Sequence, residues 1–273
     1  MQIFNDSINS STFHLQTFAY LLVEERDHVL TFTLNRERRR NALHPQMVAE
    51  IAYAFQYANT NKDIWIVVIQ AKGKVFCAGA DLKAMAGIIE PNDSTIPKPT
   101  EPILMGEMFN KLYKPTIAKI TGDVYAGGFF FLAGCNIVLA QDDVKFGLPE
   151  VKRGIYPFQV MQCLLQVMPA RKVVDWCIRG YNLPVAEAER YGLVSQMVSA
   201  EEMEAAVEGI INELKQNSPS AIRYGLLAYD EIQPSAANHK LLYDLLQQTI
   251  QSKDGQEGLK AFREKRPPVW TGE

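Results

Sequence analysis

The sequence predicts an α/β fold in which a layered core precedes an α-helical C-terminal part. Two observations support this class. Units of two strands and a helix repeat through the first half of the chain, and the pattern beyond Phe158 becomes almost wholly helical. The 273 residues suffice for one large domain or two small ones, and the 47% hydrophobic content supports a sizeable core. No shift in composition marks a linker.

The first unit begins with a strand and a helix. Val29–Leu34 alternates β-branched and apolar residues, as a strand does. Met47, Ile51, Phe55 and Ala58 share one face at helical spacing. Residues 64–70 form a short continuous apolar run, which favours a buried strand over a helix.

The second unit repeats this order after a proline-rich loop. Residues 90–102 are long enough to suggest a mobile segment over a site. Thr116–Ile120 is then expected to be a strand and Phe129–Gly134 an apolar helix, with a further strand over 137–140.

Prolines and glycines delimit the later helices. Pro184 is expected in the first turn of a helix that ends at Tyr191, with Gly192 in the C′ position. Ser218 and Pro219 should open another helix by the same logic.

Composition excludes several functional classes. A net charge of −3 is too mild to indicate a nucleic-acid or membrane partner. No apolar run is long enough for a transmembrane helix, and the first residues lack a secretory pattern. Four cysteines without CxxC spacing indicate reduced, buried thiols and a cytoplasmic protein. The polar residues 1–15 are expected to form a loose N-terminal extension.

Two glycine-bearing turns carry most of the functional information. Residues 76–83 (FCAGADLK) and residues 122–128 (GDVYAGG) each follow an apolar β-type run and lead into a helical pattern. Two such turns can aim backbone N–H groups at one point, which is what an oxyanion hole requires. A lone carboxylate, Glu150, follows in residues 146–150 (FGLPE). Together they indicate chemistry on a carbonyl whose oxygen becomes negative.

These segments resemble the crotonase superfamily, the enoyl-CoA hydratase/isomerase family. The resemblance spans about residues 20–272. Five family-like segments occur in family order: 35–43 (NRERRRNAL), 76–83, 122–128, 146–154 (FGLPEVKRG) and 257–272 (EGLKAFREKRPPVWTG). The resemblance implies a crotonase-like spiral of strand–strand–helix units over residues 16–200, and a helical C-terminal oligomerisation region over 201–273. It also implies a homotrimer or a dimer of trimers.

The resemblance implies an acyl-CoA thioester substrate, with coenzyme A as part of the substrate and no separate cofactor or metal. Ala80 and Gly127 would supply the oxyanion-hole N–H groups. Gly127 lacks a Cβ, so a thioester can approach its amide closely. The CoA moiety would lie along six residues: Ala42, Leu43, Ala78, Asp81, Leu82 and Lys83. The side chain of Asp81 is better explained as the N-cap of the following helix than as a catalytic group.

The acid/base machinery departs from the family pattern. Family hydratases carry two catalytic glutamates, and the position of the first is occupied here by Phe130. Glu150 matches the second, an arrangement similar to that of monofunctional enoyl-CoA isomerases. A neighbouring Phe run would also dry the site and raise a carboxyl pKa. Asp123, Tyr125 and Tyr156 remain candidates to replace the missing glutamate, although packing is the more common role of such tyrosines.

Other charged residues give weaker signals. The basic cluster 36–40, together with Lys260, Lys265 and Arg266, could reach the CoA phosphates, but charge runs are usually solvated surface. The histidines show no metal-ligand spacing, and His44 before Pro45 fits a helix cap.

Four functions follow from this reading. Isomerisation of an enoyl-CoA double bond leads, because one carboxylate suffices to move a proton. A hydratase or dehydratase with altered acid/base groups is second, and an acyl-CoA decarboxylase third. A non-catalytic protein that binds CoA or RNA stays open, although Glu150 and the absence of a strong basic patch argue against it.

Overall fold

A large, mostly parallel sheet forms one layer of the protein. The computed structural model describes residues 4, 8–232, 239–269 and 271. Its six strands run in the order β1-β2-β3-β5-β7-β10, and only the β1–β2 pair is antiparallel. The strands are β1 (Leu21–Arg26), β2 (Val29–Leu34), β3 (Ile66–Ala71), β5 (Thr116–Ile120), β7 (Ile137–Gln141) and β10 (Gln196–Val198).

A second sheet of short strands lies beside the first. Its order is β4-β6-β8-β9, and only β9 runs antiparallel to its neighbour. These strands are β4 (Val75–Cys77), β6 (Asp123–Tyr125), β8 (Lys145–Gly147) and β9 (Asn182–Pro184). Because β3, β5 and β7 are each followed by a strand of this sheet and then a helix, the chain forms the expected spiral of strand–strand–helix units.

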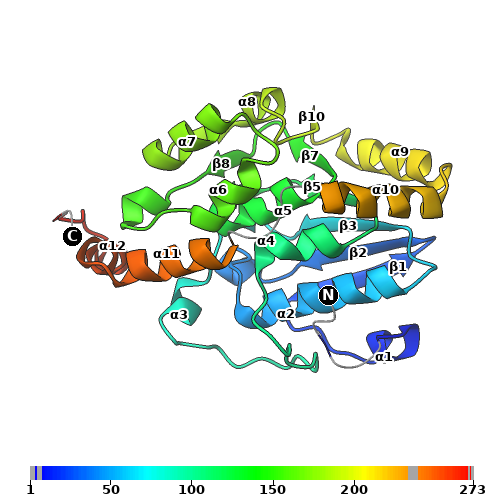
Figure 1. The fold of residues 1–273 in the computed structure, drawn as a ribbon, viewed down its shortest axis with the longest axis horizontal. Coiled ribbons are helices and arrows are strands. Elements are labelled where there is room, and N and C mark those ends of the chain that lie inside the picture. Colours follow the sequence, from blue (N-terminus) through cyan, green and yellow to red (C-terminus); the bar gives the residue numbers. More distant parts are fainter. Residues whose placement is uncertain (1–3, 5–7, 233–238, 270, 272–273) are drawn as a thin grey trace.

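Helices cover both sheets and complete the C-terminal part. Figure 1 shows α11 and α12 at one end of the molecule and α9 and α10 at the other. The α-helices are α1 (Ser10–His14), α2 (Pro45–Thr60), α3 (Leu82–Met85), α4 (Met105–Met108), α5 (Phe129–Gly134), α6 (Phe158–Leu164), α7 (Ala170–Arg179), α8 (Val185–Arg190), α9 (Met203–Lys215), α10 (Pro219–Ile232), α11 (His239–Gln251) and α12 (Lys253–Glu264). Short 3-10 helices are η1 (Glu37–Arg39), η2 (Phe109–Lys111), η3 (Ala126–Gly128) and η4 (Glu150–Arg153).

Most elements lie where the local patterns predicted them. The bounds of β2, β5 and α5 match the predicted segments, and all four residues of the predicted helical face on α2 are buried. Pro184 is the residue before α8 rather than part of its first turn, while Gly192 has the left-handed φ of +85° that a C′ glycine supplies. Residues 90–102 contain no helix or strand, yet Ile96 is buried and the Thr95 amide donates to the Thr17 carbonyl.

Among the described N-terminal residues, Phe4, Ile8 and Phe13 are buried in a segment that the sequence suggested to be a loose extension. Phe4 and Phe13 are both 1% exposed, and the Phe13 ring stacks on Tyr57 of α2 at 3.8 Å between centroids. The buried carboxylate of Glu50 accepts hydrogen bonds from the amides of Ala19 and Tyr20. A few aromatic anchors in a polar segment are therefore enough to bind it to α2.

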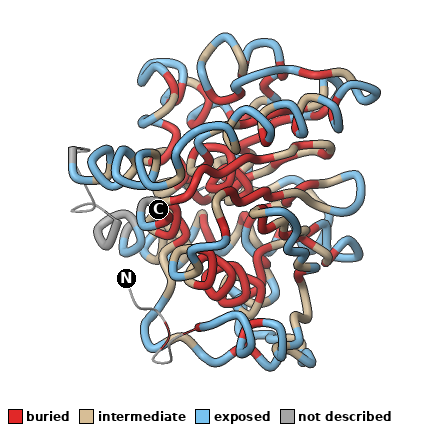
Figure 2. The backbone as a smooth tube through the Cα atoms, turned by 90° about the vertical axis from the view of Figure 1, so that its right-hand side faces the viewer, coloured by how far each residue is buried: buried red, intermediate tan, exposed pale blue. Residues whose placement is uncertain are grey.

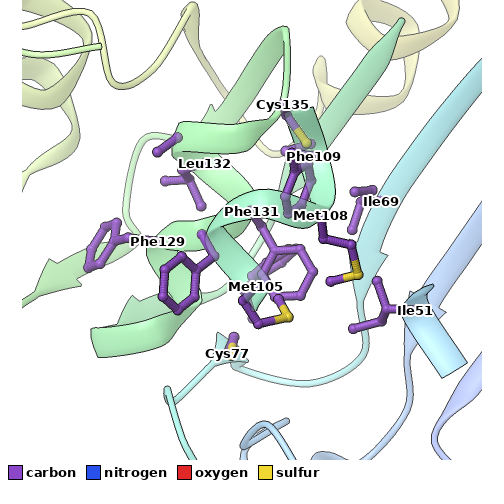
Figure 3. Packing of buried hydrophobic residues seen from close by; sticks show 14 of the residues in the cluster. Ile51, Ile69, Cys77, Met105, Met108, Phe109, Phe129, Phe131, Leu132 and Cys135 are labelled. Atoms are coloured by element: carbon purple, nitrogen blue, oxygen red, sulfur yellow. The ribbon is translucent and has the colours of Figure 1, made fainter. Parts of the chain in front are cut away.

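The core is rich in aromatic side chains. Figure 3 shows Phe131 of α5 close to Phe109 and Met105, and Phe129 pointing to the other side of the helix. Phe131 makes edge contacts with Phe76 and Phe109, and Phe129 makes one with Trp176. Figure 2 shows that the buried positions concentrate in the middle of the molecule, with exposed ones along the outer helices.

Glycines allow α12 to pack backbone against backbone on the turn that follows η4. A Cβ on Gly258 would lie 2.2 Å from the Arg153 carbonyl oxygen, and one on Gly154 would lie 2.2 Å from the Asp254 carbonyl oxygen. Gly154 also has a left-handed φ of +71°. The C-terminal helix is thus seated directly on the segment that begins with Glu150.

Substitution at this contact tests how much it stabilises the fold. We expect Gly258→Ala to lower the free energy of unfolding by about 1–3 kcal/mol, because the new methyl group forces α12 away from η4. The measurement is urea denaturation of both proteins.

Gly209→Ala in α9 is the matched control, because nothing lies within 4 Å of its added Cβ. In that open helical position alanine should stabilise the protein by about 0.5–1 kcal/mol. Equal changes in the free energy of unfolding from the two substitutions would contradict the close packing of α12 on η4.

Candidate active site

A cavity of about 120 Å³ brings the two glycine-bearing turns together with Glu150. Its walls come from the end of β4, from η3 and α5, from η4 and α6, and from α11. The lining residues are Ala78, Ala80, Leu82, Met85, Ala126, Gly127, Phe130, Glu150, Arg153, Ile155, Tyr156, Pro157, Phe158, Gln159, Val160 and Leu246. The wall is mostly apolar, so the few polar groups in it stand out.

The two turns lie side by side because β4 and β6 pair in parallel, with Cys77 opposite Val124. Gly79 has a φ of +85°, and a Cβ there would lie 2.5 Å from the Ala126 Cβ and 3.0 Å from the Gly127 nitrogen. Gly127 is itself so close that its added Cβ would be 3.6 Å from the Ala80 nitrogen. Among the hydrogen bonds of the described residues, none uses the N–H of Ala80 or Gly127. Both amides therefore remain available beside the cavity.

Ala126 is a site residue that the sequence did not reveal. It lines the cavity and has a left-handed φ of +53°, which a non-glycine residue adopts only at a cost of about 1–2 kcal/mol. This unusual backbone turns the chain between β6 and α5 so that Gly127 faces Ala80. An alanine gives no local signal for that conformation.

The early turn supports the first glycine-bearing turn from behind. The Leu43 amide donates to the Gly79 carbonyl (2.8 Å), and the Asp81 amide donates to the Leu43 carbonyl (3.2 Å). Asn41 fixes this turn: its side-chain amide donates to the carbonyls of Lys72 and Val75, each at 2.9 Å. The position of the Ala80 amide thus depends on contacts with the early turn.

Asp81 caps α3, as the sequence indicated. Its Oδ1 accepts from the amides of Lys83 and Ala84, and its Oδ2 accepts from Arg36 at 2.6 Å. Burial acts to raise the pKa of Asp81, but the hydrogen bonds from Arg36 and the capped amides outweigh it and lower that pKa. Arg36 also forms an ion pair with Glu90 at 3.0 Å, so its guanidinium is neutralised by two carboxylates of the protein.

Glu150 is the only carboxylate among the residues that line the cavity. It is 7% exposed, and its Oε2 has no hydrogen-bond partner in the described part of the chain. Burial raises its pKa to about 7, with a small opposing effect from its own backbone and from Arg153. A carboxyl group with this pKa can take up and release a proton near neutral pH.

Phe130 and Tyr156 complete the part of the wall near Glu150. Phe130 faces the cavity, unlike Phe129 and Phe131, which pack in the core. Asp123 and Tyr125 do not line the cavity; they bond to one another at 3.0 Å. Of the three candidates to replace the missing glutamate, only Tyr156 reaches the cavity. Burial raises its pKa, and its hydroxyl contacts the Met161 sulfur at 3.5 Å.

The structure divides the predicted site residues into two groups. Ala78, Ala80, Leu82, Gly127 and Glu150 line the cavity. The other predicted residues do not line it: Ala42, Leu43, Asp81 and Lys83, the last of which lines a neighbouring pocket with its ammonium 3.8 Å from Glu90. Sequence reasoning also gave no role to Arg153 or Leu246, which do line it.

Several other sequence predictions concern charged and polar groups. His44 caps α2 by accepting from the Gln46 amide at 3.1 Å. Arg266 forms a two-pronged ion pair with Glu257 on α12. Within the described ranges, no group of three His, Cys, Asp or Glu side chains could hold a metal ion, and no helix is long and apolar enough to span a membrane.

Comparisons with known proteins assign the family. The sequence model described as "Enoyl-CoA hydratase/isomerase" matches residues 24–273. A probable enoyl-CoA hydratase of Mycobacterium bovis is 32% identical over 93% of this chain and 99% of its own length. A mevalonyl-coenzyme A hydratase of Aspergillus fumigatus is 31% identical over 89% of this chain and 91% of its own length.

Solved structures agree with this assignment. The carnitinyl-CoA hydratase of Mycobacterium avium has a TM-score of 0.82 and 26% identity, and the match covers 94% of this chain and all of that one. Sequence, fold and the arrangement of the two turns therefore lead to one conclusion: the chain belongs to the enoyl-CoA hydratase/isomerase family.

Proposed function

We propose that this enzyme shifts the double bond of an enoyl-CoA thioester, with Glu150 as its single acid/base group. The observation that carries this proposal is the buried Oε2 of Glu150, which has no hydrogen-bond partner in the described part of the chain, in a cavity where Phe130 occupies the position of the first family glutamate. A phenyl ring neither moves a proton nor orients water. One carboxylate with a pKa of about 7 remains to do both proton transfers.

The thioester carbonyl would accept hydrogen bonds from the amides of Ala80 and Gly127. Glu150 would then remove an α-proton from a β,γ-enoyl thioester, and the negative charge would spread onto the thioester oxygen. Each oxyanion-hole donor is typically worth about 3–4 kcal/mol in the transition state. The protonated Glu150 would return the proton to the γ-carbon, which completes the shift without any gain or loss of atoms.

A hydratase is the second candidate, and the position of Tyr156 favours it. Tyr156 lines the same cavity as Glu150, and its hydroxyl, which is protonated at neutral pH, could turn from the Met161 sulfur to hold a water molecule. The names of the relatives above also support hydration. A decarboxylase stays a third candidate, because the same two amides would stabilise the enolate left by loss of CO₂.

The wider setting of the proposal is an oligomer. Most residues of α10 are exposed in the single chain, including Tyr224 at 66% and Tyr229 at 55%. A helix with so little burial is expected to find its partner in another subunit. We propose a homotrimer or a dimer of trimers, which sedimentation of the purified chain would measure, working in the cytoplasm on acyl-CoA without a further cofactor.

Substitution of Glu150 tests the reaction. We expect Glu150→Gln to reduce turnover of a 3-enoyl-CoA by about 10²–10⁴-fold, because glutamine cannot transfer the proton. Binding of a saturated acyl-CoA should remain. The assay follows isomerisation of 3-enoyl-CoA and hydration of trans-2-enoyl-CoA on the same preparation.

The two substrates separate the candidates. Hydration as the main activity would contradict the single-glutamate isomerase and favour Tyr156 as the second polar group. Full activity of Glu150→Gln would remove Glu150 from the reaction. Turnover of neither substrate by the unsubstituted enzyme would turn attention to decarboxylation or to a binding role.

The pH dependence of the reaction follows from the same carboxyl group. Because Glu150 must be ionised to accept the α-proton, kcat/KM should rise with pH about tenfold per unit below pH 7 and level off above it. The measurement is the initial rate with a 3-enoyl-CoA between pH 5 and 9. A midpoint near the ordinary glutamate pKa of 4.5 would contradict a desolvated base.

The raised pKa also predicts an effect on stability. The native state favours the protonated carboxyl. Below about pH 4.5 the carboxyl is protonated in both the folded and the unfolded state and does not reduce the free energy of unfolding. That free energy falls as the pH rises from 4.5 through 7. A difference from 4.5 to about 7 corresponds to up to about 3 kcal/mol. Glu150→Gln, a neutral isostere, should therefore be more stable than the unsubstituted enzyme at pH 8 and about equally stable near pH 4.

Urea denaturation at the two pH values measures this difference. Glu208→Gln, at an exposed position on α9, is the control and should change stability little at either pH. A Glu150→Gln protein that loses stability equally at both pH values would show a structural role for the carboxylate instead.

A further inference from the structure

Arg153 is a charged residue of the cavity that the proton transfer leaves unused. It ends η4, three residues after Glu150, and lines the same cavity. The residues near it in the chain that share this wall are mostly apolar, among them Ile155, Pro157 and Phe158. A guanidinium keeps its positive charge at any physiological pH, so it is a fixed cation in a mostly apolar wall.

No anion of the protein neutralises this cation within the described residues. No carboxylate of that part lies within the 4.0 Å of an ion pair, and no hydrogen bond there uses the Arg153 guanidinium. The guanidinium lies over the face of the Phe262 ring on α12, with Cζ 4.4 Å from the ring centroid. An aromatic face attracts a cation but accepts no strong hydrogen bond, so the N–H groups of Arg153 remain available.

Glu150 does not serve as the missing anion. Its pKa of about 7 means that it is only partly ionised at neutral pH. Burial lowers the pKa of Arg153, and the opposing effect of Glu150 does not restore it. Tyr156 and Gln159, the nearby polar members of the wall, are neutral.

Two other arginines of this protein, the buried Arg36 and the partly exposed Arg266, show what a paired site looks like. Arg36, at 6% exposed, is held by Asp81 at 2.6 Å and by Glu90 at 3.0 Å. Arg266 has two contacts with Glu257, at 2.6 and 2.9 Å. Arg153 is, like Arg266, only partly exposed, and a charge removed from much of the solvent is normally paired in this way. The fold thus supplies carboxylates to these two arginines and none to Arg153.

We propose that Arg153 binds a carboxylate on the acyl chain of the substrate, so that the preferred substrates are CoA thioesters with a second acidic group. The proposal rests on the acyl-CoA site proposed above. A phosphate of CoA has the same charge, but the location of Arg153 on the Glu150 turn favours the acyl group, where Glu150 acts. Two oxygens of a carboxylate match the planar fork of a guanidinium.

Binding of saturated acyl-CoAs tests this without any turnover. Glutaryl-, adipyl- and pimeloyl-CoA carry a terminal carboxylate, and pentanoyl-, hexanoyl- and heptanoyl-CoA are their neutral counterparts of equal length. None has a double bond to hydrate or shift. Calorimetric titration of the full chain should show tighter binding of the acid at one or more lengths, by roughly 10–100-fold for one charge-assisted pair.

Variants locate the preference. Arg153→Gln should abolish it and leave the affinity for the neutral acyl-CoAs within about twofold, whereas Arg153→Lys should retain part of it. Lys152→Gln is the matched control, because it removes the same charge from the exposed neighbour on the same turn. This control should keep the full preference.

Several outcomes would overturn the proposal. Equal affinity of the unsubstituted enzyme for acids and neutral chains at all three lengths would do so, and this result does not depend on any variant folding. So would a preference that survives Arg153→Gln. Equal weakening of both series by Arg153→Gln would assign the residue to a CoA phosphate instead.

The binding and turnover measurements distinguish the two proposals. A clear preference for acids without turnover of any enoyl-CoA would leave the acyl carboxylate site standing and remove the proton shuttle. Turnover that depends on Glu150, with no preference for acids, would do the reverse.

Discussion

The close contact between the turn at Gly79 and the turn at Gly127 is the constraint on which the rest of the site depends. Parallel pairing of β4 and β6 brings the turns together, and the missing Cβ of Gly79 lets Ala126 approach. The left-handed backbone of Ala126 and Gly79 is the conformational cost of that approach. The early turn, held by Asn41, then supports one side, and α5 extends from the other.

The charges of the protein are arranged in two ways. Around Asp81, every charge has a partner: Arg36 bonds to Asp81 and Glu90, and Arg39 also bonds to Glu90. In the cavity, Glu150 and Arg153 have no such partners within the described residues. Neutralised charges hold the scaffold together, whereas unneutralised charges are available for a ligand. A charge that lines the cavity without a partner in the described part of the chain is therefore the feature that distinguishes the site from the surrounding scaffold.

Local patterns predicted much of this fold, because they depend on neighbours in the chain. The apolar runs of β2 and β5, the Phe-rich α5 and the cap at Asp81 could all be recognised from short segments. The placement of Glu150 beside the two turns came from resemblance and not from local physics. Which tyrosine reaches the cavity could not be predicted, because Tyr125 and Tyr156 differ only in tertiary contacts. The same holds for the packing of Phe4 and for α12 on η4.

The packing of α12 on η4 affects how a ligand enters and leaves the cavity. Leu246 of α11 forms part of the cavity wall, α11 packs on α6, and α12 packs on η4, so the docking of these helices helps to enclose the cavity. Local detachment of these helices would admit water to Glu150 and to Arg153 while leaving both sheets intact. The free energy of this docking thus governs both the dryness of the carboxyl group and the frequency with which the cavity opens. Very stable docking of these helices would exclude water from the site but slow the release of product.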